Sequence, residues 1–151
     1  MKKVLLINSD ISEVIEKYFE GKDVGIIEEG NYDLAVYDDF TGELPANSIN
    51  IHPSLLPAFE RENAIEQAFL AGVKVSGVTI HNNDKILAQY PVLIGVDTHI
   101  DEYRQDIIEV KKRLVPPVIE SILEDKVFDF QDLFKSPCAH NRGCSGCSGC
   151  H

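Results

Sequence analysis

The stretch SINIHPSLLPAF, residues 48–59, carries two polar side chains in an apolar run that stops at a proline. Asn50 and His52 are two residues apart, which places them on the same face of an extended strand. Pro53 ends the run, because proline has no backbone N–H to give to a sheet. An amide beside an imidazole at the end of a strand makes this stretch the first candidate for a functional site.

On both sides of this stretch, apolar residues alternate between the periods of strands and helices. Strands are predicted at residues 2–8, 23–29, 32–39, 48–52, 73–81 and 85–94. Helices are predicted at residues 11–20, 62–72 and 100–125, the last bent or broken at Pro116 and Pro117. This alternation predicts an α/β fold with a mostly parallel sheet, helices on both of its faces and a late antiparallel hairpin.

Composition sets the size and the class of the protein. A chain of 151 residues with 44% hydrophobic residues predicts one globular domain, which we place at residues 1–135, followed by a tail at residues 136–151. The 14 basic residues face 25 acidic ones, for a formal charge of -11, so the phosphate backbone of a nucleic acid would be repelled. The one basic cluster, Lys111 to Arg113, fits the solvated face of a helix. We therefore expect no nucleic-acid partner.

The first residues, MKKVLLIN, contain too short an apolar run for the core of a signal peptide and no small-residue cleavage site. No segment of the sequence approaches the apolar length of a membrane span. We expect a cytoplasmic protein with no membrane partner.

Four motifs occur in an order that is typical of one enzyme family. They are NIHPSLLPAF (50–59), AIEQAFLAGVKVSGVTIH (64–81), ILAQYPV (86–92) and DTHIDEYRQDIIEVKKRLVPPVI (97–119). Together they resemble the second half of the formyltetrahydrofolate-dependent formyltransferases, nearest to the phosphoribosylglycinamide formyltransferases. The resemblance covers about half of the chain. It implies a formyltransferase-like, Rossmann-like fold, a cis peptide bond between Leu56 and Pro57, and transfer of a formyl group from 10-formyltetrahydrofolate to an amine.

The resemblance also assigns roles to the residues of the first stretch. It implies that Asn50 and His52 flank the formyl group and that an Asp on a later loop completes the site. An amide N–H and a protonated imidazole both stabilise the oxyanion of an acyl-transfer intermediate, and a nearby carboxylate favours the protonated imidazole. Asp84, in the turn NND, is the carboxylate near the position of that loop. Because Asn and Asp favour tight turns, Asp84 also fits a role as a turn former, and His81 fits a structural histidine at a strand end.

The four cysteines form a second candidate site. Cys138, Cys144, Cys147 and Cys150 lie within the last 14 residues in the pattern C-x5-C-x2-C-x2-C. In a reducing compartment such clustering indicates metal binding and not structural disulfides. Overlapping C-x2-C units favour a [4Fe–4S] cluster, with zinc as the alternative.

Two functions are therefore open at this point. In the first, the chain is a compact formyltransferase whose partners are a folate and an amine substrate, with Asn50, His52 and Asp84 at its site. In the second, the fold is inherited, the transfer site is partial, and the cysteines serve a redox, sensing or docking role toward a protein partner.

Overall fold

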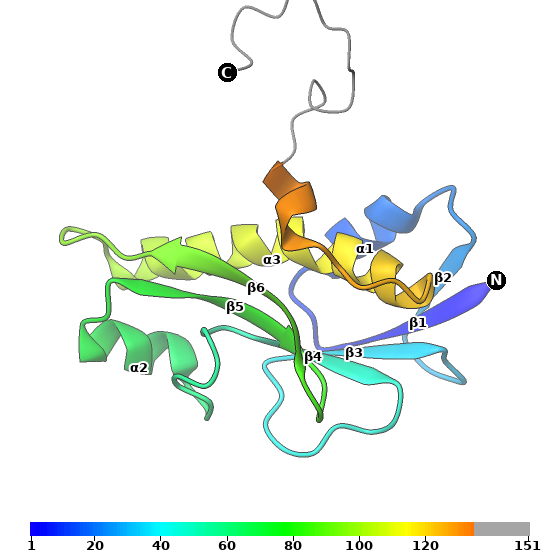
Figure 1. Cartoon of the computed structure of the whole chain (residues 1–151), viewed down its shortest axis with the longest axis horizontal. Coiled ribbons are helices and arrows are strands. Elements are labelled where there is room, and N and C mark those ends of the chain that lie inside the picture. Colours follow the sequence, from blue (N-terminus) through cyan, green and yellow to red (C-terminus); the bar gives the residue numbers. More distant parts are fainter. Residues whose placement is uncertain (135–151) are drawn as a thin grey trace, which may run out of the picture.

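A single six-stranded sheet organises the protein, in the order β2-β1-β3-β4-β5-β6. The computed structural model describes residues 1–134. The strands are β1 (Lys2–Ile7), β2 (Val24–Ile27), β3 (Leu34–Asp38), β4 (Ser48–His52), β5 (Val75–His81) and β6 (Ile86–Leu93). Strands β1 to β4 pair in parallel, and β4, β5 and β6 pair antiparallel. The predicted α/β class, with a mostly parallel sheet and a late antiparallel hairpin, is confirmed (Figure 1).

The helices are α1 (Ser12–Phe19), α2 (Ala64–Ala71), α3 (Ile100–Leu123) and the short 3-10 helix η1 (Phe130–Phe134). Of the two outcomes predicted at Pro116 and Pro117, a bend or a break, the break does not occur, because α3 is a single helix that continues through both prolines. Val115 and Pro116 are buried, so packing against the core holds the helix together where two backbone N–H donors are missing. The Ser121 hydroxyl donates to the carbonyl oxygen of Pro117 at 3.0 Å, which occupies one backbone acceptor of this region.

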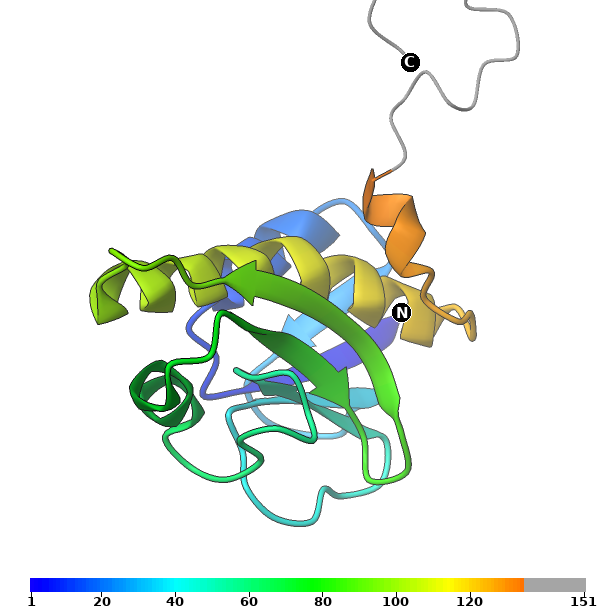
Figure 2. The ribbon, with the colours of Figure 1, turned by 60° about the vertical axis from the view of Figure 1, so that its left-hand side comes forward.

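One face of the sheet forms the hydrophobic core with α1 and α3. Val4, Val36, Ile51 and Ile80 lie on this face and are wholly buried. Figure 2 shows α3 running along the sheet beside α1, the helix that buries Ile15 and Phe19 against the core. Residues of opposite parity along the strands face the other way, and these include Asn50 and His52. The core helices and the polar pair therefore lie on opposite faces of the sheet.

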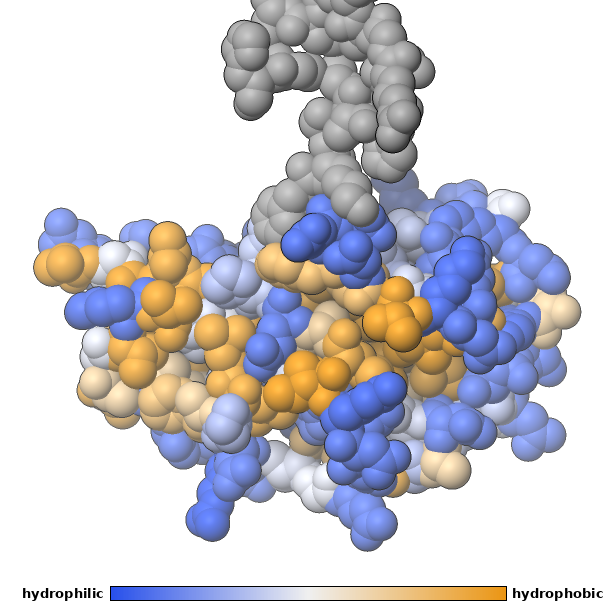
Figure 3. All heavy atoms as spheres, viewed as in Figure 1, coloured by the Kyte–Doolittle hydropathy of each residue, from blue (hydrophilic) through white to orange (hydrophobic). Residues whose placement is uncertain are grey.

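The strand β6 is an edge of the sheet. Figure 3 shows apolar side chains gathered along it, and Ile86 and Leu93 are exposed. Pro91 interrupts the row of N–H donors that this strand presents, a common feature of edge strands. None of the helices within residues 1–134 has both the length and the apolar character that crossing a bilayer requires.

Candidate functional site

The strand β4 carries the predicted pair. Every residue of β4 is buried, and the exposed fractions of Asn50 and His52 are 1% and 2%. Asn50 is in register with Tyr37 on β3 and with His81 on β5, and His52 is in register with Thr79. The structure therefore brings Asn50 and His52 together on one face of the sheet, as their spacing in the sequence predicted.

The Asn50 side chain binds the backbone of Phe40, the second residue after β3. Its Oδ1 accepts the Phe40 N–H at 3.0 Å, and its Nδ2 donates to the Phe40 carbonyl oxygen at 2.9 Å. The same Nδ2 lies 3.2 Å from Nε2 of His81. An amide nitrogen has two hydrogens, so both donors of Asn50 have acceptors within the protein.

These contacts fix the protonation of His81. Because Asn50 Nδ2 is a donor, Nε2 of His81 must accept, and Nδ1 then carries the hydrogen that reaches the carbonyl oxygen of Asn82 at 3.2 Å. The ring therefore carries its hydrogen on Nδ1 and is held at both nitrogens. This arrangement fits the structural role that the sequence suggested for a histidine at the end of a strand.

His52 is held by a different carbonyl. Its Nε2 lies 2.7 Å from the carbonyl oxygen of Phe59, so Nε2 carries a hydrogen and donates it. Burial lowers the pKa of His52 below its ordinary value, and the Phe59 hydrogen bond and the charge of Asp39 oppose this effect. At neutral pH the imidazole is uncharged, and Nδ1 carries its lone pair.

The segment after β4 turns back over His52. The peptide bond between Leu56 and Pro57 is cis, which confirms the prediction for this bond. The Thr79 hydroxyl donates to the Ser54 carbonyl oxygen at 2.7 Å and accepts the Leu56 N–H at 3.1 Å. The Gln89 amide donates to the Leu56 carbonyl oxygen, also at 3.1 Å. Side chains of β5 and β6 thus hold the segment after β4 in place.

Sequence reasoning missed Thr79 and Gln89 as parts of the site. A signal for Thr79 is nevertheless present, because it precedes His81 by two residues and so shares its face of β5. Gln89 is the residue of β6 opposite Thr79. A row of polar residues on one face of neighbouring strands would have pointed to both.

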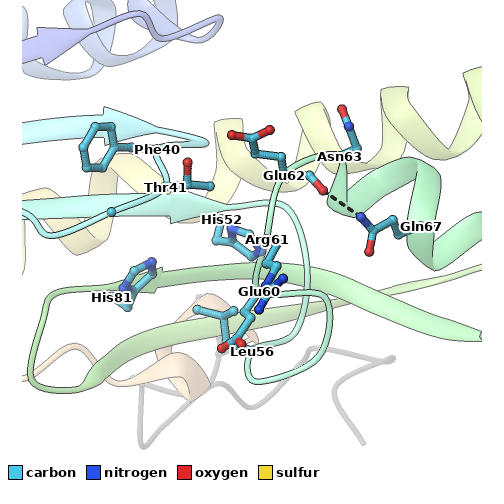
Figure 4. A pocket seen from close by; sticks show the side chains of 11 residues that line it. Phe40, Thr41, His52, Leu56, Glu60, Arg61, Glu62, Asn63, Gln67 and His81 are labelled. Atoms are coloured by element: carbon cyan, nitrogen blue, oxygen red, sulfur yellow. Dashed lines mark hydrogen bonds between the residues drawn. The ribbon is translucent and has the colours of Figure 1, made fainter.

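A cavity of about 640 Å³ opens beside His52. Figure 4 shows His52 and His81 on its floor, with Phe40 and Thr41 on one side and the 60–67 region on the other. That second wall carries Glu60, Arg61 and Glu62, and Gln67 closes it by donating to the Glu62 carbonyl oxygen at 3.0 Å. A cavity with an imidazole on its floor and charged groups on its wall can hold a polar small molecule.

The structure does not bring Asp84 into this cavity. Asp84 lies exposed on the turn between β5 and β6, beside a different hollow of the surface. Oδ1 of Asn82 accepts the N–H groups of Asp84 and Lys85, each at 2.9 Å, which is the hydrogen-bonding of an Asx turn. A catalytic role for Asp84 stays a prediction, made for a residue that shares no cavity with His52.

The same turn holds the loop between β3 and β4. Oδ1 of Asn83 accepts the Leu44 N–H at 2.9 Å, and its Nδ2 donates to the Leu44 carbonyl oxygen at 2.7 Å. This repeats the contact that Asn50 makes with Phe40. Two asparagine side chains, one from β4 and one from the hairpin turn, therefore fix the loop at residues 39–47.

A buried ion pair lies at the carboxyl ends of β1 and β3. The Lys111 ammonium is 2.8 Å from Oδ1 of Asp38 and 3.6 Å from Oδ1 of Asp10. The exposed fractions of the Lys111 and Asp38 side chains are only 7% and 4%. The Ser9 hydroxyl donates to the second oxygen of Asp38 at 3.3 Å. The charge of Lys111 is therefore balanced by the carboxylates of Asp38 and Asp10.

Within residues 1–134, no three His, Cys, Asp or Glu side chains are grouped so that they could hold a metal ion. The predicted metal ligands Cys138, Cys144, Cys147 and Cys150 lie outside the described residues, as does the whole predicted tail at 136–151.

Known proteins of one family resemble this chain. The family model described as formyl transferase matches residues 10–119. Phosphoribosylglycinamide formyltransferase of Bacillus subtilis is 36% identical over 107 residues, which are 67% of this chain and 55% of that protein. Formyltetrahydrofolate deformylase of Bacillus subtilis is 32% identical over 120 residues, which are 77% of this chain and 39% of that protein. The chain thus spans about half or less of the length of these relatives.

Solved structures share the fold. The phosphoribosylglycinamide formyltransferase of Anaplasma phagocytophilum superposes with a TM-score of 0.67 at 23% identity, covering 86% of this chain and 88% of that one. The enzyme of the same name from Streptococcus pneumoniae gives a TM-score of 0.64, also at 23% identity, and covers 82% of this chain and 99% of that one.

Proposed function

Because the chain belongs to the formyl transferase family, we propose that it is a divergent member, weak or inactive as a purine transformylase, with a metal centre in its C-terminal tail. The observation that supports weak or absent transferase activity is the hydrogen bonding of Asn50. Both of its amide hydrogens are engaged by Phe40 and His81, so neither is directed at a formyl oxygen.

The chemistry of formyl transfer explains why this matters. The amine nitrogen forms a bond to the formyl carbon, the bond from that carbon to the donor nitrogen breaks, and the proton that the amine loses is balanced by one that the donor nitrogen gains. The intermediate carries an oxyanion, which an amide N–H and an imidazolium stabilise. Here the lowered pKa of His52 leaves little imidazolium at neutral pH, and its Nε2–H already binds Phe59. Neither the Asn50 amide nor the His52 ring is therefore set up to donate a hydrogen bond to the oxyanion.

The carboxyl end of β1 supports the same proposal. In doubly wound α/β folds, phosphate groups commonly bind at a glycine-rich turn after the first strand. In this chain that turn is Asn8, Ser9 and Asp10, and the nearby Lys111 is neutralised by Asp38 and Asp10. A phosphorylated acceptor would meet carboxylates there. This disfavours phosphoribosylglycinamide, the substrate in the name of the related formyltransferases.

The second half of the proposal is the metal centre of the tail. Four thiols in the pattern C-x5-C-x2-C-x2-C suit a [4Fe–4S] cluster, and zinc is the alternative for the same ligands. Cys138, Cys144, Cys147 and Cys150 would hold it, and the bound metal would supply a redox, sensing or docking function toward a protein partner in the cytoplasm. Because the predicted tail is separate from the body, deletion of residues 136–151 should leave residues 1–135 folded.

Metal analysis of anaerobically purified protein tests the metal centre. We expect a brown protein with broad absorption near roughly 400 nm that is bleached by dithionite, and lower iron occupancy when serine replaces any of the four cysteines. Colourless protein with one equivalent of zinc would replace the cluster by zinc at the same residues. Protein that contains neither metal would refute the metal centre.

A second candidate function is an active compact formyltransferase that moves a formyl group from 10-formyltetrahydrofolate to an amine. The observation in its favour is that Asn50 and His52 share one face of β4, with His52 on the floor of a cavity. On this proposal His52→Ala should lower kcat by about 10²-fold or more with the fold intact. Wild-type protein that neither binds a folate nor consumes a formyl donor would exclude it.

A further inference from the structure

We propose that the face of β1, β2 and β3 opposite the core helices binds an amphipathic helix of a protein partner, and that the polar side of that helix is basic. This docking depends on neither the C-terminal tail nor the transfer site, so it lies beyond the proposed function. We call the surface the open face, and its apolar side chains are those of Met1, Leu5, Ile7, Ile27, Tyr37 and Phe40.

The register of the sheet sorts the apolar residues of β1 to β3 onto two faces. Val4 is in register with Ile26 on β2 and with Leu34 on β3, and these three side chains belong to the core or pack against it. Leu5, the next residue of β1, is in register with Ile27, so both side chains face the other way. The parallel part of the sheet therefore carries apolar residues on both of its faces.

The open face extends to the carboxyl ends of the strands. Ile7 and Tyr37 are in register with each other and point to the same side as Leu5. The centroid of the Tyr37 ring lies 4.9 Å from that of Phe40. Phe40 is on this side of the sheet because Asn50, which is in register with Tyr37, binds its backbone. Since Phe40 also lines the cavity beside His52, the open face reaches the edge of that cavity.

Within residues 1–134, no helix covers the open face. The crossover from β1 to β2 contains α1, whereas the connections at residues 28–33 and 39–47 contain no helix. Figure 1 shows α1 and α3 on one side of β1 and β3, with only loops on the other side. Leu5, Ile7 and Ile27 are half-buried, and they neither belong to the hydrophobic core nor pack against it. Parallel strands with apolar residues on both faces are typical of sheets that have helices on both faces, so this surface lacks one layer.

Gly25 leaves a flat place in the open face. It is in register with Lys3, so a Cβ atom there would point to the side of Leu5 and would lie 3.0 Å from Sδ of Met1. The Met1 side chain that lies over this glycine is 78% exposed, and a methionine is flexible enough to move aside. A glycine within a strand often marks a place where another backbone comes close. The open face therefore has room for the close approach of a helix.

The size of the open face fits one helix. Three strands about 4.8 Å apart, with about four residues each, give a surface about 10 Å wide and about 15 Å long. A helix with its side chains is about 10–12 Å wide. A stable dimer of globular chains buries about 800 Å² on each partner, several times the area of this face. The area therefore favours a single helix over a second copy of the chain.

The charges around the open face determine the polar side of the partner. Glu28 and Glu29 directly follow β2 and Asp39 follows β3, and all three are exposed. Lys3 adds a positive charge at the amino end of β1, where the exposed Asp33 accepts its backbone N–H at 2.7 Å. An acidic border attracts lysine and arginine and repels a second copy of a chain whose formal charge is -11. A helix with apolar residues on one side and basic residues on the other complements both the face and its border.

A synthetic amphipathic peptide of leucine and lysine, roughly 18 residues or about five helical turns long, tests this docking on the full-length protein. We expect it to bind and to shift the backbone NMR signals of β1, β2 and β3. A peptide with glutamate in place of lysine should not bind, because the border of the face is acidic. In Leu5→Thr with Ile27→Thr the affinity for the basic peptide should fall by about tenfold or more. The matched variant Ile86→Thr with Leu93→Thr, which removes exposed apolar side chains from β6, should bind like the wild type.

Three results would overturn the proposal. The first is equal affinity in the wild type and in Leu5→Thr with Ile27→Thr, because the peptide would then bind through charge alone. The second is a set of shifted signals that lies on β6 and not on β1 to β3. The third is a wild-type dimer in sedimentation velocity that the same double variant converts to monomer, because the open face would then bind a second copy.

A charge variant provides a test that leaves the sheet intact. Glu28→Gln with Glu29→Gln changes only exposed residues after β2, and it should weaken binding of the basic peptide by about threefold or more at low salt. Unchanged affinity would contradict the basic partner even if the variants within the strands folded poorly. None of these measurements involves formyl transfer or the metal of the tail, so their failure would leave the proposed function standing, and failure of the proposed function would leave the docking.

Discussion

The oxygen and the nitrogen of the Asn50 side-chain amide both bind the backbone of Phe40, in the way that paired strand residues bind each other. The N–H and the carbonyl oxygen of Phe40 are both paired with this one side chain, at 3.0 and 2.9 Å. The contact joins β4, the strand that carries His52, to the loop whose residues Phe40 and Thr41 line the cavity. It also explains why the asparagine is buried, a position that polar side chains occupy only when their hydrogen bonds are satisfied.

Removal of the Asn50 amide should destabilise the protein. In Asn50→Ala the Phe40 N–H and carbonyl lose their partner next to a buried site, and we expect the free energy of unfolding to fall by about 1–3 kcal/mol. Asn83→Ala is the matched control, because Asn83 makes the same contact with Leu44 but its own side chain is exposed, so its removal leaves no cavity in the interior. Its loss should stay below about 1 kcal/mol. Urea denaturation measures both values, and an equal loss in the two variants would contradict the prediction.

The buried pair of Lys111 and Asp38 gives a larger effect. Lys111→Met leaves the Asp38 carboxylate without its ammonium partner in the interior, and we expect a loss of about 3–5 kcal/mol. Removing both charges in Lys111→Met with Asp38→Leu should recover much of that loss. Lys112→Met, on the exposed side of α3, should change stability by less than about 0.5 kcal/mol. A single variant no less stable than the double variant would argue against an uncompensated charge.

Gly77 has no room for a methyl group. A Cβ atom there would lie 2.2 Å from the carbonyl oxygen of Tyr90 and 2.6 Å from Cδ2 of Leu55. Gly77→Ala should therefore separate β5 from β6 and displace the turn over His52, with a loss of about 3 kcal/mol or more. In Gly25→Ala the new atom meets the flexible end of Met1 at 3.0 Å, so we expect less than about 1 kcal/mol. Thermal unfolding of the two variants makes the comparison.

We expect the free energy of unfolding to fall at low pH, because His52 is protonated less readily in the folded protein than in the unfolded chain. Its pKa in the folded state lies below the ordinary 6.5, so the unfolded chain binds a proton first as the pH falls. The stability contributed by neutral His52 is complete above the unfolded pKa and is lost as the pH falls through the lower, folded pKa. Between pH 7.5 and pH 5, His52→Gln should therefore lose less free energy of unfolding than the wild type. The same substitution at the exposed His99 should keep the wild-type loss, and identical losses in all three proteins would exclude His52 as the cause.

The sequence was sufficient for the elements and for the face of β4. Short apolar runs bounded by turn residues predicted the six strands of residues 1–134, and the two-residue spacing of Asn50 and His52 placed their side chains on one face, because strand geometry has a fixed period. Local rules failed at Pro116, where burial of α3 against the core outweighs the preference of proline to end a helix.

The contacts that define the site could not be predicted in the same way. Asn83 meets Leu44 at a separation of 39 residues, and Lys111 meets Asp38 at a separation of 73. Such pairs depend on the order of strands in the sheet, which no local period encodes. Asp38 illustrates the difficulty, because in the sequence it is one of two adjacent aspartates, and only the fold shows that Asp38 is the one buried against Lys111.

The two asparagine contacts also bear on how the loop at residues 39–47 moves. Amide hydrogens of loops usually exchange with solvent quickly, but the N–H groups of Phe40 and Leu44 are bound to side chains that belong to the sheet and its hairpin. In deuterated water these two amides should be protected like strand amides, within a loop whose other exposed amides exchange fast. A substrate that needs the loop to open would have to wait for both contacts to break, so the exchange rates of two hydrogens would report how often the cavity becomes accessible.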